Sequence, residues 1–208
     1  DRFIDTRAGQ AEIYILQGVK ELFTVEPDIS PRIFFTGAVS DRQIRAFMTN
    51  AFDTKLWQGK IAVTVDGKSR KVSAVEKVVP TDLTKTNFIK ITLEEPLSVD
   101  DLAGDVQLSI EGFSPARVVM MGVLDALVDE GEMGALYTKE LTTFRVWSPV
   151  SRSVSLHLFA NAETAVSDRV VAMKKDAVGT WNASVPGDLN GWFYLYEYDS
   201  YGETRTGV

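Results

Sequence analysis

The chain has 208 residues, 45% of them hydrophobic, and a formal charge of −7 from 22 basic and 29 acidic residues. This composition is enough for one or two ordinary cores and excludes an intrinsically disordered chain. The acidic balance excludes nucleic acid as an expected partner, because such binding depends on Lys and Arg neutralising phosphates. There is no cysteine, so disulfide and thiolate chemistry are excluded. No run approaches the ~20 apolar residues of a membrane-spanning helix, so we expect no membrane partner.

Apolar and polar residues alternate along the first half of the chain, as half-buried strands require. The dipeptide Asp66-Gly67 predicts a two-residue hairpin turn because both positions tolerate positive φ. Val72 and Val75 are assigned to the return arm of this hairpin, and the basic run 68–71 is interpreted as a solvent-exposed part of it. The expected strands are residues 13–16, 44–48, 61–65, 88–93, 106–110 and 118–121.

The second half shows the same two-residue period more clearly. Trp181, Ala183 and Val185 are in phase, which places Trp181 in a core. The last predicted strand is apolar on both faces, with aromatic side chains at the even positions 192–198 on one side and Phe193 and Leu195 on the other. Such a strand is either central and covered twice, or one of its faces packs on another part of a larger protein.

Short strands separated by turns every 8–12 residues predict an all-β fold of two immunoglobulin-like antiparallel β-sandwich domains. We expect the first domain at residues 1–122, a linker at 123–133 and the second domain at 134–208, with a turn or two of helix at most in 123–128. The carboxylates of the linker are interpreted as a solvated connector, because a catalytic pair needs a rigid scaffold. They are Asp125, Asp129, Glu130 and Glu132.

Four elements follow one another in a specific order between residues 133 and 196. They are Met133-Gly134-Ala135-Leu136-Tyr137, the run from Thr142-Thr143-Phe144 to Trp147-Ser148-Pro149, Gly179-Thr180-Trp181, and the run from Gly187-Asp188-Leu189 to Tyr194-Leu195-Tyr196. Together they resemble the family 48 carbohydrate-binding module that precedes the catalytic barrel of type I pullulanases. Phe193 stands where this pattern has a tyrosine. Residues 110–115 and 123–125 are similar to the domain that precedes the module in these enzymes.

This resemblance implies a parent enzyme, a glycoside hydrolase that cleaves α-1,6-glucosidic branches of pullulan, starch or glycogen. That chemistry needs two carboxyl groups flanking the scissile bond, which in this family lie on a (β/α)₈ barrel. No alternating βα pattern occurs in this chain, so we assign no catalytic residue to it. The chain is expected to be a non-catalytic accessory region of a bacterial enzyme, either cytoplasmic or secreted. Its expected partners are the barrel itself and, through the parent enzyme, α-glucan.

Sugar-binding modules stack glucose rings on exposed aromatic side chains. Glycogen-binding members of the resembled family carry tryptophans at two places that correspond here to residues 159–162 and 199–204. Neither place has a tryptophan, and only Tyr201 could substitute. The resemblance therefore implies weak or no independent glucan binding. Trp147, Trp192 and Tyr201 are the candidate carbohydrate-binding or barrel-docking residues, whereas Trp57 is a weaker candidate.

The sequence gives little support for a catalytic, metal-binding or cofactor-binding site. His157 is the only histidine, on the polar face of its strand, without a Ser–Asp constellation or a second metal ligand. No phosphate loop, dinucleotide fingerprint or metal-spaced carboxylate motif is present, so we expect no cofactor. The alternative to an enzyme accessory region is a stand-alone immunoglobulin-like adhesion or interaction module, because such sandwiches host many functions.

Overall fold

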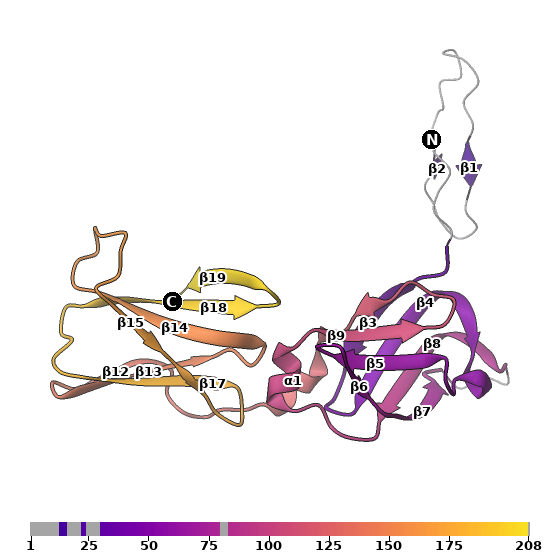
Figure 1. Cartoon of the computed structure of the whole chain (residues 1–208), viewed down its shortest axis with the longest axis horizontal. Coiled ribbons are helices and arrows are strands. Elements are labelled where there is room, and N and C mark those ends of the chain that lie inside the picture. The colour runs from indigo at the N-terminus through magenta and orange to yellow at the C-terminus, as the bar shows by residue number, and fades with distance from the viewer. Residues whose placement is uncertain (1–12, 16–21, 24–29, 80–82, 208) are drawn as a thin grey trace, which may run out of the picture. The chain divides into compact units, whose positions relative to one another are not determined.

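The computed structural model describes residues 13–15, 22–23, 30–79 and 83–207. The chain divides into two compact units, residues 1–31 and 32–208. Within the first unit, β1 (Tyr14–Ile15) pairs antiparallel with β2 (Leu22–Phe23). The second unit holds two separate hydrophobic cores, each lying between two sheets (Figure 1).

The first sandwich consists of a five-stranded and a four-stranded sheet. The larger sheet has the order β11 (Val119–Met120), β3 (Ile33–Ala38), β4 (Gln43–Asp53), β8 (Lys85–Leu93) and β7 (Val72–Lys77). The smaller sheet has the order β10 (Ala116–Arg117), β9 (Val106–Ile110), β5 (Ile61–Val65) and β6 (Lys68–Arg70). Neighbouring strands are antiparallel except for β11, which runs parallel to β3. The alternation read from the sequence is confirmed in β4, where every second residue from Ile44 to Met48 is buried.

The hairpin predicted at Asp66-Gly67 is present, with φ of 49° and 76° at the two turn residues. Its return arm, however, is β6 alone, which pairs with β5. The assignment of Val72 and Val75 to this arm is wrong, because both lie in β7 and pair with β8 in the opposite sheet. The chain crosses between the two sheets after β6, which lets Val75 point into the core from the other side.

Short helices close the first sandwich. α1 (Val99–Ala103) was not foreseen, although Ser98 and Asp101 form a complete capping box that satisfies two backbone N–H groups at its start. The buried Leu102 holds this helix against the core. Two 3-10 helices, Thr54–Leu56 and Gly122–Ala126, complete the helical structure of the described residues.

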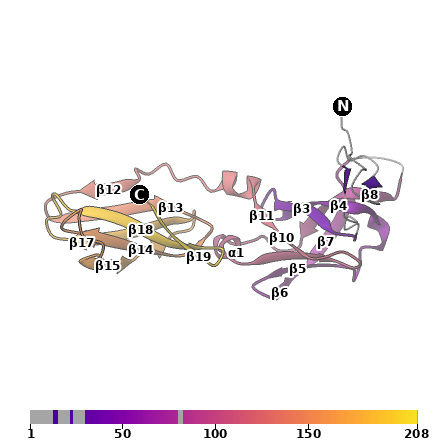
Figure 2. The ribbon, with the colours of Figure 1, turned by 90° about the horizontal axis from the view of Figure 1, so that it is seen from above.

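The second sandwich consists of two four-stranded sheets, which lie one above the other in Figure 1 and overlap in the view from above in Figure 2. One has the order β12 (Gly134–Tyr137), β13 (Leu141–Trp147), β17 (Thr180–Pro186) and β16 (Lys174–Lys175). The other has the order β15 (Arg169–Ala172), β14 (Ser151–Phe159), β18 (Phe193–Ser200) and β19 (Glu203–Gly207). Every pairing in these two sheets is antiparallel. The predicted fold of two all-β sandwiches is thereby confirmed.

Aromatic side chains fill much of the second core. Trp181 is buried, as predicted, and its indole Nε1 donates to the carbonyl of Ser148 (3.0 Å). The rings of Phe144, Tyr194 and Tyr196 follow one another edge to face, with centroids 5.2 and 5.4 Å apart. Such edge-to-face pairs are favourable because the positive ring edge meets the negative ring face.

The stretch predicted to be a solvated linker is more ordered than expected. Val123 is buried in the first core, and the side chain of Asp129 is only 9% exposed. The Asp129 carboxylate accepts hydrogen bonds from the hydroxyl of Thr180 and the guanidinium of Arg145, both at 2.6 Å. The expectation of solvated carboxylates is therefore wrong at Asp129, whereas Asp125, Glu130 and Glu132 are exposed.

Candidate carbohydrate-binding and docking site

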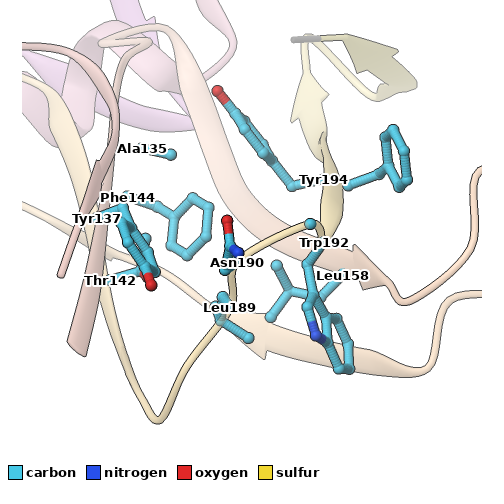
Figure 3. A pocket seen from close by; sticks show the side chains of 11 residues that line it. Ala135, Tyr137, Thr142, Phe144, Leu158, Leu189, Asn190, Trp192 and Tyr194 are labelled. Carbon is cyan, nitrogen blue, oxygen red and sulfur yellow. The ribbon is translucent and has the colours of Figure 1, made fainter. Parts of the chain in front are cut away.

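A pocket of about 220 Å³ lies at one end of the second sandwich. Three of the four sequence elements that define the resemblance meet in its wall, although they are up to about 60 residues apart. The first supplies Tyr137, the second Phe144, and the last supplies Leu189, Trp192 and Tyr194. Figure 3 shows Tyr137 and Phe144 on one side, Trp192 and Leu158 on the other, and Asn190 and Leu189 between them.

Strand pairing explains why these side chains converge. Tyr137 of β12 lies opposite Thr142 of β13, and Ala135 lies opposite Phe144, so all four face the same side of their sheet. In the other sheet, Leu158 of β14 lies opposite Tyr194 of β18. The loop between β17 and β18 then crosses from one sheet to the other and closes the end of the sandwich.

Hydrogen bonds fix this loop. One carboxylate oxygen of Asp188 accepts from the hydroxyl of Tyr137 and from the backbone N–H of Asn190, both at 2.9 Å. The hydrogen bond to Asp188 also raises the pKa of the Tyr137 hydroxyl. Gly187 and Gly191 adopt φ of 100° and 79°, a region that side chains disfavour, which explains the glycines at both ends of the loop.

Two polar side chains of the pocket wall have no partner within the described part of the chain. Thr142 is only 2% exposed, and its Oγ1 is buried without a hydrogen bond. The amide of Asn190 is exposed at the pocket and hydrogen-bonds to no described residue. Buried polar groups are normally paired, so the Thr142 hydroxyl is an unsatisfied group behind the pocket wall, without accessible surface for a ligand to contact.

The structure separates the three candidate aromatic residues. Trp192 lies in the pocket wall and packs against the second core. Trp147 lies at the end of β13, is 41% exposed, and donates from its indole to the carbonyl of Val178 (3.1 Å). It does not line the pocket, so the two tryptophans do not form one common platform.

Tyr201 sits in the turn between β18 and β19 with φ of 59°. The guanidinium of Arg117, from the first sandwich, lies over its ring at 4.3 Å from the centroid. Burial at this place raises the pKa of the Tyr201 hydroxyl. Arg152 belongs to the same junction, where it donates to the carbonyl of Ala103 (3.2 Å) and pairs with Asp66. One face of the Tyr201 ring is therefore occupied by a cation.

An exposed apolar stripe crosses the outer face of the β15–β14–β18 sheet. Val170 and Leu195 flank His157 across β14, and Phe193 lies beside them, opposite Phe159. Phe193 is 52% exposed, and Val170 and Leu195 are exposed as well. The even-numbered aromatic side chains of β18 point inward, with Tyr196 fully buried. The outer face of this strand is thus the uncovered one.

The remaining residues singled out from the sequence, Trp57 and His157, make contacts within their own sandwiches. Trp57 packs partly against the first core. His157 is half-buried in the outer face of its sheet, with Nδ1 3.1 Å from the hydroxyl of Ser167. Among the described residues, no three His, Asp or Glu side chains gather closely enough to hold a metal ion. None of the helices in the described ranges is both long and apolar enough to cross a membrane.

Sequence reasoning about exposed tryptophans missed Thr142, Asn190 and the bond between Tyr137 and Asp188. The available signal was the spacing of the motif elements themselves. Each element combines a glycine or threonine with an aromatic residue, and in the folded chain residues of the first, second and last elements share one pocket. A search for stacking platforms looks for exposed rings only and passes over a site built from half-buried ones.

Comparison with known families defines the class of the second sandwich. Residues 132–207 match the family model of carbohydrate-binding module 48, the isoamylase N-terminal domain. The match spans both sheets of the second sandwich and the pocket at its end. The residues of the second sandwich thus match the family that the ordered sequence elements resemble.

The relatives that the chain resembles are pullulanases. A pullulanase of Bacillus subtilis (strain 168) is 35% identical over 72 residues, which are 35% of this chain and 10% of that protein. A pullulanase of Klebsiella pneumoniae is 23% identical over 158 residues, which are 67% of this chain and 14% of that protein. This chain therefore corresponds to a small part of each.

A solved structure shows the same fold over both sandwiches. The pullulanase of Bacillus acidopullulyticus superposes on 85% of this chain with a TM-score of 0.74, covering 35% of its own length at 16% identity. A Group B Streptococcus pullulanase superposes on 85% with a TM-score of 0.65, covering 23% of its own length, also at 16% identity. The chain is similar to the N-terminal region of pullulanases, as its sequence predicted.

Proposed function

We propose that this chain is the non-catalytic N-terminal accessory region of a pullulanase-like enzyme that hydrolyses α-1,6-glucosidic branches of pullulan, starch or glycogen. The similarity of both sandwiches to pullulanases supports this assignment, and so does the small share of each pullulanase that the chain spans. Structures of pullulanases from Bacillus subtilis and Group B Streptococcus, the latter at a TM-score of 0.65, are of complexes with maltose and maltotetraose. Those complexes support α-glucan as the class of ligand for the whole enzyme.

The second sandwich in this proposal docks on the catalytic barrel and helps to shape its substrate cleft. The observation that carries this role is the exposed apolar stripe of Val170, Phe193 and Leu195 on an otherwise well-packed module. An exposed apolar patch usually marks an interface, because leaving it in water is unfavourable. The exposed Trp147 is a second candidate contact, on the other sheet of the module.

Independent glucan binding by the chain is proposed to be weak. The stretches 159–162 and 199–204 lack tryptophan. Arg117 covers one face of the Tyr201 ring, so this residue offers less open surface to a sugar than an uncovered tyrosine does. The division into domains at residues 1–122 and 134–208, with a linker at 123–133, is part of the same proposal.

The docking role is tested by placing a charge on the stripe in two contexts. Leu195→Glu in a full-length parent enzyme should lower both the melting temperature and kcat/KM on pullulan, because the barrel contact is lost. In the isolated chain the same change should barely affect melting, since the side chain already faces water. Val166→Glu, an equally drastic change at a more exposed apolar residue of the same module, is the matched control.

Two outcomes would contradict this proposal. Equal destabilisation by Leu195→Glu in both contexts would show that the residue stabilises only its own sandwich. Release of reducing ends from pullulan by the purified chain, above a buffer control, would contradict a non-catalytic role.

A further inference from the structure

We propose that the two sandwiches form one rigid body whose junction is held by charged contacts, so that the sandwiches move independently once those charges are screened or removed. Domains of one chain usually move relative to each other unless a large apolar interface joins them. Here each sandwich keeps its own core, and charged side chains make most of the contacts that link the two. Rigidity must therefore come from where these contacts are placed.

Arg152 makes two of these contacts. It lies near the start of β14 in the second sandwich, and its Nε donates to the carbonyl of Ala103 at the end of α1 (3.2 Å). Its Nη2 donates to the carboxylate of Asp66, in the hairpin turn after β5. The same Asp66 oxygen accepts the backbone N–H of Asp105 (2.9 Å), which holds the carboxylate in place. One guanidinium thus binds two separate elements of the first sandwich.

A second cation of the second sandwich reaches the same helix. The side chain of Lys175 is only 10% exposed, and its Nζ lies 3.7 Å from a carboxylate oxygen of Asp100 in α1. Within its own sandwich the ammonium donates to the carbonyl of Pro149 (3.2 Å) and lies 5.3 Å from the ring centroid of Trp181. Burial lowers the pKa of Lys175, and the Asp100 carboxylate opposes that shift. Because a nearby anion stabilises a buried ammonium, Asp100 ties α1 to the second sandwich.

The first sandwich contributes one cation in the other direction. Arg117 of β10 lies over the ring of Tyr201 at 4.3 Å from the centroid, and its Nε is 3.4 Å from a carboxylate oxygen of Asp105. Val150, just before β14, adds an apolar contact by packing against the first core. The three cations of the junction belong to three different strands, β10, β14 and β16. Contacts at separate points oppose rotation of one sandwich about any single one of them.

The linker leaves little free length between the sandwiches. Leu127 packs partly against the first core. Asp129, only two positions further on, is held in the second sandwich by the Thr180 hydroxyl and the Arg145 guanidinium, both at 2.6 Å. Residue 128 alone separates these two attachments, so the linker cannot act as a flexible spacer.

The charged contacts of the junction are open to solvent. The side chains of Arg152 and Asp66 are 45% and 47% exposed, and that of Asp100 is 93% exposed. Salt weakens such pairs, because the Debye length falls from about 30 Å at 0.01 M to about 3 Å at 1 M. Salt should therefore loosen the junction while both cores stay folded. Under the proposed accessory role, the intact junction fixes where the first sandwich stands relative to the barrel.

NMR relaxation of the backbone amides measures whether the two sandwiches tumble together. The intact 208-residue chain is compared at about 0.01 M and about 1 M NaCl. We expect one rotational correlation time for both sandwiches at low salt. At high salt each sandwich should have its own, shorter by about a third or more, because a domain freed from its neighbour tumbles as a smaller body. Unchanged chemical shifts within each core verify that both remain folded.

Two charge variants separate the junction from a general effect of charge. Arg152→Glu removes the contacts with Ala103 and Asp66, and should give two correlation times already at low salt. Lys60→Glu makes the same change of charge at a residue that pairs with Glu111 inside the first sandwich (3.2 Å). This control should keep the single correlation time of the wild type.

The linker attachment is tested at Gly131. A Cβ at this position would lie 1.8 Å from Nη1 of Arg145, so Gly131→Ala displaces the guanidinium that binds Asp129. We expect the correlation times of this variant to separate at a lower salt concentration than those of the wild type. Glu130→Ala, at an exposed neighbour in the linker, is the control and should follow the wild type.

Three results would overturn the inference. Different correlation times for the two sandwiches at low salt would show that they are independent domains. A common time that persists at about 1 M salt would show that charges do not hold the junction. The same behaviour of Arg152→Glu and Lys60→Glu would mean that Arg152 has no part in it. The accessory role is tested with Leu195→Glu in a full-length enzyme, so either proposal can fail without the other.

Discussion

The two sandwiches share an architecture but differ in how many aromatic side chains they place in the core. In the first, the largest fully buried side chains are aliphatic, and Phe34, Phe35 and Phe47 are exposed on the larger sheet, Phe34 by 71%. In the second, Phe144 and Trp181 are buried and further aromatic rings line a pocket. The comparison teaches that layered β-structure does not create a site by itself. The site arises where loops bring half-buried rings and polar groups to one end of the layers.

The largest expected losses of stability come from truncating one buried side chain in either core. Ile91→Ala in the first sandwich and Leu156→Ala in the second should each cost about 2–5 kcal/mol of unfolding free energy, because both side chains are fully buried. Urea unfolding followed by tryptophan fluorescence measures this. Because three of the four tryptophans lie in the second sandwich, Leu156→Ala should displace the fluorescence transition more. Identical curves for the two variants would indicate one cooperative unit instead of two cores.

A smaller difference in unfolding free energy is expected between substitutions of the buried Trp181 and of the exposed Trp147. Trp181→Phe loses the indole hydrogen bond to Ser148 and the contact with Lys175, whose Nζ lies 5.3 Å from the ring centroid. We expect a loss of about 1–3 kcal/mol. Trp147→Phe also loses an indole hydrogen bond, to Val178, but at an exposed position, and should cost less than about 1 kcal/mol. Thermal melting of the isolated chain would contradict the assignment if the order were reversed.

Acid should weaken the attachment of the linker to the second sandwich. Hydrogen bonds from the Thr180 hydroxyl and the Gly131 N–H, together with Arg145, lower the pKa of Asp129 against the opposing effect of burial. A folded-state pKa below the unfolded value of about 3.9 means that the stabilisation is present above pH ~4 and is lost as the pH falls through the folded pKa.

The pH dependence is measured with Asp129→Asn, which keeps the shape and removes the charge. The wild type should be more stable than this variant at neutral pH, and the difference should shrink below pH ~4. Asp125→Asn, at an exposed linker carboxylate, serves as the control and should show no such convergence. A constant difference between wild type and Asp129→Asn from neutral to acidic pH would refute a charge-dependent attachment.

The smallest expected effect concerns the contact between the sandwiches. A cation–π pair at a partly exposed place contributes about 0.5–1 kcal/mol, so Arg117→Ala and Tyr201→Leu should show a coupling of that size in a double-mutant cycle. Additive effects of the two changes would mean that the Arg117 guanidinium over the Tyr201 ring contributes no measurable energy.

Local patterns predicted much of the fold because each residue's environment repeats with the strand period. The alternation in β4, the turn at Asp66-Gly67 and the inward phase of Trp181 are all visible in short windows. The crossing between sheets after β6 was not predictable in this way, because alternation looks the same in either sheet. The five-residue helix α1 is too short to show a helical period in the sequence. Its capping box, Ser98 and Asp101, was the only local signal for it.

The site was only partly predictable for a related reason. Trp192 was predicted as a candidate carbohydrate-binding or barrel-docking residue, and it lines the pocket. The burial of the Thr142 hydroxyl without a partner depends on its surroundings, and the partial covering of Tyr201 depends on Arg117, 84 positions earlier in the chain. Both facts are properties of three-dimensional packing, which no short window of sequence contains.

The central claim, that the outer stripe of the second sandwich docks on a catalytic barrel, can be measured through side-chain accessibility. Hydroxyl-radical footprinting of the isolated chain and of a full-length parent enzyme compares oxidation rates at the same residues. The account predicts that Phe193 and Leu195 become strongly protected in the full-length enzyme, while the exposed Val166 and Phe34 react equally in both. Equal oxidation of Phe193 and Leu195 in the two proteins would contradict it.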